Sequence, residues 1–170
     1  MALENWFEQG KLVKHEATKE ELSAILGVVE RNFQDAGIKG LSSDQKYILS
    51  YQAAFEVSLA LIKCHGFRPI KVGHHYIVWQ CMKDVLGESS RKSILLFENA
   101  AKKRNKLSYD IAGLASQKEA DEMCQESRNF VALIKEEIKI KLRIKLILMK
   151  RKVIVPKTVR QHIEKEFKKS

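Results

Sequence analysis

Basic and hydrogen-bonding side chains gather in one short stretch of the chain, residues 102–110. Within it Arg104 is followed by Asn105, and Tyr109 by Asp110. On a helix, Asn105 and Tyr109 share a face, with Arg104 about 100° around the axis. A guanidinium is a planar fork of donors that matches phosphate oxygens, so the stretch predicts a site for a phosphate-bearing ligand. The alternative is a solvated last helical turn, where the helix dipole favours basic residues.

Two adjacent histidines, His74 and His75, form a second candidate site directly after Gly73. Imidazoles titrate close to neutral pH and can exchange protons with a substrate. The alternative for this pair is one packing residue at a helix start and one surface group. Tyr76 and Trp79 follow at near-helical spacing, and we expect them in the core rather than on a surface that stacks bases.

The sequence predicts neither a metal ion nor a cofactor. The residues of metal-binding type nearest one another are Cys64, His65, His74, His75 and Cys81. Their spacing matches no common zinc pattern. Glycine-rich phosphate loops, nucleophile elbows and histidine-glutamate metalloprotease motifs are absent from the sequence. The three cysteines are an odd, widely spaced set, so we interpret Cys64, Cys81 and Cys124 as reduced core residues.

Amphipathic periodicity predicts the helices that carry the candidate residues. A helix of residues 89–109 holds the arginine stretch, and a helix of residues 75–86 begins at the histidine pair. The other predicted helices are residues 18–36, a helix from Ser43 or Asp44 to Gly66, and residues 117–150, with residues 67–74 as a connection. Capping boxes are predicted for Thr18 with Glu21 and for Ser116 with Glu119.

The pattern after Ile138 has two interpretations. Apolar and basic residues alternate there as in a strand, but Ile134, Ile138, Leu142 and Leu146 also form a helical stripe. We expect the helix to continue to about Lys150, and a further short helix after Pro156.

These elements predict an all-α fold, an antiparallel bundle of four or five helices with a basic C-terminal extension. The 170 residues are 45% hydrophobic, which suffices for a single core. Residues 1–138 are expected to form the bundle, and residues 139–170 the extension. The sequence has neither an apolar run of membrane-spanning length nor a signal-peptide pattern, so we expect a cytoplasmic protein without membrane contact.

Positive charge is concentrated in the extension. The net charge is +10, and residues 139–170 hold 12 basic residues against Glu164 and Glu166. Such a segment can collect phosphates without sequence preference. We predict nucleic-acid contacts from three basic residues of the extension and from three lysines of the 102–110 stretch. They are Lys150, Arg151 and Lys152, and Lys102, Lys103 and Lys106. The alternatives are a solvated end of the chain and an apolar segment that completes the bundle or a dimer interface.

The chain resembles HEPN-domain proteins, a prokaryotic helical family, over roughly residues 1–137. Arg104 and Asn105 match the start of the family motif, in which an arginine precedes a histidine near a helix end, and Tyr109 stands where the histidine is expected. The segments Gly66-Phe67-Arg68-Pro69 and Gly73-His74-His75-Tyr76 resemble an inter-helix connection of small HEPN proteins. The resemblance implies a helical bundle and a homodimer in which the arginine motifs of two subunits meet.

The resemblance also implies a chemistry. In HEPN ribonucleases the ribose 2′-hydroxyl attacks the adjacent phosphate without a metal ion, histidine handles the proton, and arginine stabilises the developing charge. Arg104 fits the last role, and Asn105 can orient it. A phenol with a pKa of about 10 makes Tyr109 a poor substitute for histidine, unless His74 or His75 takes that place.

We therefore expect an RNA-binding HEPN protein of a toxin–antitoxin or defence system, acting through Arg104, Asn105, Tyr109 and Asp110, with metal-independent endoribonuclease activity as its enzymatic form. The alternative is a non-catalytic HEPN interaction module that partners a nucleotidyltransferase. A third interpretation is a helical protein that binds nucleic acid only through its basic extension.

Overall fold

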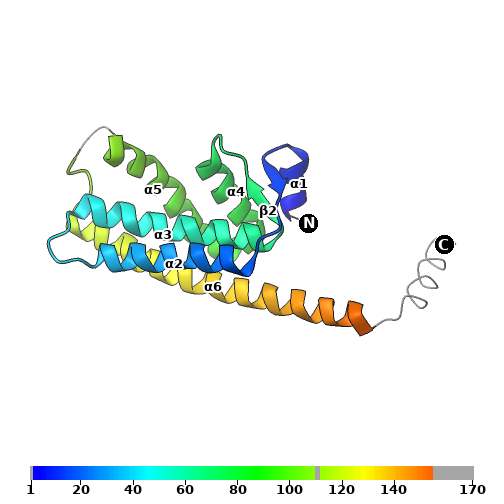
Figure 1. Cartoon of the computed structure of the whole chain (residues 1–170). Coiled ribbons are helices and arrows are strands. Elements are labelled where there is room, and N and C mark those ends of the chain that lie inside the picture. The colour runs from blue at the N-terminus through cyan, green and yellow to red at the C-terminus, as the bar shows by residue number, and fades with distance from the viewer. Residues whose placement is uncertain (1, 110–111, 155–170) are drawn as a thin grey trace. The chain divides into compact units, whose positions relative to one another are not determined.

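The computed structural model describes residues 2–109 and 112–154, which are mostly helical (Figure 1). The α-helices are α1 (Ala2–Glu8), α2 (Lys19–Ala36), α3 (Ser43–Cys64), α4 (His74–Leu86), α5 (Arg91–Tyr109) and α6 (Gln117–Ile154). A short 3₁₀ turn, η1 (Glu88–Ser90), precedes α5, and the strands β1 (Leu12–Lys14) and β2 (Phe67–Pro69) form a small sheet. The helical fold predicted from the sequence is confirmed at this level. The chain divides after Ile138 into two units.

Helix α3 is the central element of the first unit. It contacts α2, α4 and α5, and Figure 1 shows α2 alongside it. Because neighbours cover it on several sides, its buried residues are not restricted to one stripe. They are Tyr47, Ser50, Tyr51, Ala53, Ala54, Phe55, Val57, Ser58, Ala60, Leu61 and Ile62. The two buried serines donate to carbonyls one turn back, Ser50 to Lys46 and Ser58 to Ala54, so neither hydroxyl is left unsatisfied.

The helix starts follow the predicted capping chemistry with two differences. The Thr18 hydroxyl accepts from the Glu21 amide at 3.1 Å, as predicted. The Glu21 carboxylate does not complete that capping box, because it accepts from Lys63 and contacts His15. Helix α3 is capped by Ser42, one residue before Ser43 and two before Asp44, the predicted caps, and the Ser42 hydroxyl accepts from the Gln45 amide.

The connection predicted for residues 67–74 contains strand β2. It pairs antiparallel with β1, with Val13 opposite Arg68. Three-residue strands are too short to show a period in the sequence, so hydrophobic patterning does not detect them. Lys14 extends over the rings of Phe7 and Phe67 and holds this sheet against α1.

Helix α6 begins with a complete capping box. The Glu119 amide donates to the Ser116 hydroxyl, and the Ser116 amide donates to the Glu119 carboxylate. The helical interpretation of the alternating segment is confirmed, since α6 continues to Ile154. The helix predicted after Pro156 lies outside the described residues. None of the described helices is long and apolar enough to cross a membrane.

Candidate anion-binding site between α4 and α5

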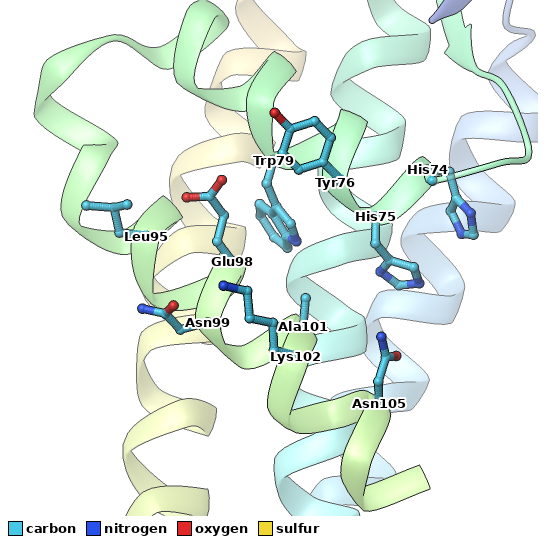
Figure 2. A pocket seen from close by; sticks show the side chains of 11 residues that line it. His74, His75, Tyr76, Trp79, Leu95, Glu98, Asn99, Ala101, Lys102 and Asn105 are labelled. Carbon is cyan, nitrogen blue, oxygen red and sulfur yellow. The ribbon is translucent and has the colours of Figure 1, made fainter. Parts of the chain in front are cut away.

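A cavity of about 620 Å³ lies between α4 and α5 (Figure 2). Its lining includes His74, His75, Tyr76 and Trp79 of α4, and Lys102 and Asn105 of α5. The structure therefore brings the histidine pair and the arginine stretch, predicted as separate sites, to one place. Figure 2 shows the His75 ring and the Asn105 amide facing each other across the cavity.

The tautomer of His75 follows from a chain of two hydrogen bonds. The indole N–H of Trp79, which can only donate, donates to the Tyr51 hydroxyl at 3.1 Å. The Tyr51 oxygen lies 2.8 Å from Nδ1 of His75, and the described residues offer the Tyr51 proton no other acceptor, so we assign that proton to the bond with Nδ1. Neutral His75 therefore carries its proton on Nε2. His75 thus has one hydrogen-bond donor left for other groups.

The surroundings of His75 disfavour its charged form. Its ring stacks on Phe55 with the centroids 4.0 Å apart. Burial, followed by the nearby positive charges of His74 and Arg104, lowers the pKa of His75 to about 4. At neutral pH the imidazole is neutral. It can donate a hydrogen bond from Nε2 but cannot act there as a base.

His74 has the opposite arrangement. Its Nδ1 lies 3.0 Å from the carbonyl of Lys71, an acceptor, so in the neutral ring this nitrogen carries the proton. Nε2 of His74 is then left with a lone pair. The two rings lie 4.5 Å apart, centroid to centroid. Two adjacent histidines thus offer different groups, a proton acceptor on His74 and a donor on His75.

Arg104 is not among the residues that line the cavity, but it lies close enough to influence both His75 and Tyr51 by its charge. Its Nη1 donates to the Asn105 side-chain oxygen at 3.3 Å, which leaves the amide N–H₂ of Asn105 as its available group. Nε of Arg104 is buried without a hydrogen-bond partner. Among the described residues Arg104 also forms no ion pair. A guanidinium left in this state is a strong attractor for an anion.

The one carboxylate that lines the cavity is already neutralised. Glu98 forms an ion pair with Lys83 at 2.8 Å and accepts a hydrogen bond from Gln80. Lys102 adds a positive charge to the lining. The groups near His75 and Asn105 are therefore mainly donors, and they favour an anionic ligand.

The remaining predicted site residues are placed as follows. Lys103 is engaged in an ion pair with Glu119 at 2.6 Å and lies over the Tyr47 ring, whereas Lys106 is exposed. Tyr109 ends α5, but its side chain lies outside the described residues, as does Asp110. The side chains of Lys150, Arg151 and Lys152 lie outside them too.

Two core predictions need correction. Trp79 is buried as predicted, but Tyr76 is 65% exposed. Position 76 lies in the first turn of α4 and lines the cavity, which its near-helical spacing to Trp79 did not reveal. Cys81 is in the core, whereas Cys64 and Cys124 are only half-buried and pack at its edge.

Tyr51 is a member of the site that sequence reasoning missed. It lies 24 positions before His75, on a helix whose periodicity assigned it to the core. The available signal was its chemistry, because a buried phenol needs a hydrogen-bond partner. Within residues 2–109 and 112–154 no group of three or more histidine, cysteine or acidic residues is arranged to hold a metal ion.

Comparisons of the chain with protein-family models, with curated proteins and with solved structures found no match. The resemblance to HEPN proteins therefore depends on the quoted residues alone. The function must be argued from the chemistry of the cavity.

Proposed function

We propose that the protein binds RNA and that the cavity between α4 and α5 holds a phosphate of the RNA backbone, as in a HEPN-type site. The observation that carries this proposal is Arg104, which has a buried Nε without a partner and no ion pair among the described residues. The N–H of His75 and the amide of Asn105 add uncharged donors beside it. Donors around an uncompensated guanidinium suit a phosphodiester, which offers two oxygens and one negative charge.

The same site can support metal-independent cleavage. In this mechanism Nε2 of His74 takes the proton from the ribose 2′-hydroxyl, and the hydroxyl oxygen attacks the adjacent phosphorus. The bond to the 5′-oxygen breaks, and the proton returns from His74 to that leaving oxygen. Arg104 and the N–H of His75 stabilise the charge that develops on the phosphoryl oxygens. The products are a 2′,3′-cyclic phosphate and a 5′-hydroxyl.

A non-catalytic module is the second candidate, and one observation favours it. His75 is held neutral with Nδ1 occupied by Tyr51, so it cannot serve as an imidazolium acid. Binding without turnover would suit an interaction module paired with a nucleotidyltransferase in a toxin–antitoxin or defence system. For the ribonuclease and the non-catalytic module alike, we propose a homodimer and, as for HEPN bundles, an antiparallel arrangement of the helices.

The decisive experiment is incubation of the protein with labelled RNA in EDTA, using wild type, Arg104→Ala and His74→Ala. Arg91→Ala is the matched control, because Arg91 lies at the other end of α5 and pairs with Glu88. Circular dichroism monitors the fold.

Cleavage that produces 2′,3′-cyclic ends and is lost in Arg104→Ala and His74→Ala supports the enzyme. Binding that needs Arg104, without cleavage by wild type, supports the module. RNA binding that is unchanged in Arg104→Ala would contradict the proposed site.

A further inference from the structure

The exposed aromatic ring of Tyr76 is unexplained by phosphate binding. Its side chain is 65% exposed although it lines the cavity. Leu95, on the α5 side of the cavity, is 45% exposed, whereas Val72, which is 82% exposed, does not line the cavity. Large apolar surface left open beside a cavity indicates a surface used for binding rather than for packing.

The cavity has an apolar part and a polar part. Tyr76 and Leu95 line the apolar part together with the largely buried Trp79, apart from the facing His75 and Asn105 in Figure 2. Glu98 lies between Leu95 and Tyr76 in Figure 2, and its charge is paired with Lys83. A volume of about 620 Å³ accommodates a ligand larger than a phosphate alone. The complementary ligand has a flat, weakly polar group joined to an anionic group, which is the chemistry of a nucleotide.

We propose that Tyr76 stacks against an unpaired base of the RNA whose phosphate binds near Arg104 and His75. This inference rests on the proposed function and specifies its substrate class as single-stranded RNA. A base in a duplex is already stacked on both faces, so it can reach Tyr76 only by unpairing at a cost of a few kcal/mol. An aromatic ring accepts any base because every base has a π-face, so the stacking contact selects for strandedness more than for sequence.

Binding of fluorescently labelled RNA tests the inference by anisotropy. The probes are a single-stranded decamer of adenylate, the same decamer paired with its complement, and a decamer with abasic sites in its central positions. The proteins are wild type, Tyr76→Ala, Tyr76→Phe, Arg104→Ala to report on the phosphate site and, as the matched control, Val72→Ala. Thermal unfolding checks that each variant is folded.

We expect Tyr76→Ala to weaken binding of the single strand about tenfold, with Tyr76→Phe and Val72→Ala close to wild type, because stacking needs the ring but not the hydroxyl. The duplex and the abasic decamer should bind wild type about as weakly as the single strand binds Tyr76→Ala. Equal binding of all three RNAs, or no loss in Tyr76→Ala while Arg104→Ala still abolishes binding, would overturn the stacking role and leave the phosphate site intact. Absence of RNA binding by wild type would overturn both.

Discussion

The Tyr51 hydroxyl, which accepts a hydrogen bond from the Trp79 indole, fixes the tautomer of His75. The pKa of His75 is lowered from 6.5 to about 4, so the unfolded chain binds a proton at His75 more readily than the folded protein does. The free energy of unfolding that His75 contributes should therefore be constant above about pH 6.5 and fall as the pH falls from about 6.5 to about 4.

Urea unfolding at pH 7.5 and pH 5.0 measures this effect in wild type and His75→Gln. The loss of stability between the two pH values should be larger in wild type, because the variant has no imidazole to protonate. An equal loss in both proteins would mean that His75 is not shielded as the structure indicates.

Tyr51 joins the core to the site through its hydroxyl. Tyr51→Phe should leave the buried N–H of Trp79 and Nδ1 of His75 without their partner, at a cost of about 1–3 kcal/mol in the free energy of unfolding. The matched control is Tyr47→Phe, one turn earlier on α3, whose hydroxyl has no hydrogen-bond partner among the described residues. A urea midpoint for Tyr51→Phe that matches the control would contradict the hydrogen-bonded chain.

Sequence reasoning at the residue scale succeeded where neighbouring positions carried the signal. Arg104 and Asn105 are adjacent, and the hydrogen bond between them is local. The meeting of His75 with Asn105 depends on how α4 packs against α5, which local spacing does not determine. The exposure of Tyr76 depends on the same packing.

Among the connections between elements, the carboxylate of Asp44 ties the start of α3 to the segment before α6. It accepts from the backbone amides of Gly113 and Ala115, the latter at 2.9 Å. Asp44→Ala removes both hydrogen bonds and the favourable charge at the α3 N-terminus, so we expect a loss of about 1–2 kcal/mol in the free energy of unfolding.

Glu20→Ala is the matched control for this measurement. Glu20 also lies in the first turn of a helix, α2, but its exposed carboxylate has no such loop contact among the described residues. Urea denaturation should show a clearly larger loss for Asp44→Ala. Similar losses of unfolding free energy in the two variants would mean that Asp44 stabilises the protein only through its interaction with the helix dipole.

The helices were predictable because hydrogen bonds between residues close in the sequence determine where they begin and end. Thr18 and Ser116 cap their helices through contacts three residues away. The cap of α3 was placed one or two residues too late, at Ser43 or Asp44, because Ser42, Ser43 and Asp44 are all residue types that cap helices. Strands β1 and β2 pair residues more than 50 positions apart, and no local pattern reports such a pairing.

At the scale of the whole molecule, the segment after Ile138 carries charge and exposed apolar side chains together. Its exposed apolar residues are Ile140, Leu142, Ile144, Leu146 and Ile147. If the segment is mainly an RNA-binding extension, truncation after Ile138 should leave a folded dimer. The slope of log affinity against log salt should then fall by about 0.7 for each lost contact with single-stranded RNA.

Light scattering coupled to size exclusion, thermal unfolding and salt titrations of RNA binding test this on the full chain and the truncated chain. A truncated protein that becomes monomeric, aggregates or melts at a much lower temperature would show that the apolar residues form an interface. A full-length monomer at micromolar concentration would remove the argument for a site shared between subunits.

The alternation of residues 138–145 has a consequence for the unfolded chain. In the folded protein these residues are helical, so their isoleucines and lysines are spread around the axis. In an extended chain the same residues place every apolar side chain on one face and every basic one on the other, which is the pattern of a strand that adds to a sheet edge. Stacked copies would bring like charges within about 5 Å of one another. Because salt screens that repulsion, heat-induced aggregation should be suppressed at low ionic strength and promoted at high ionic strength.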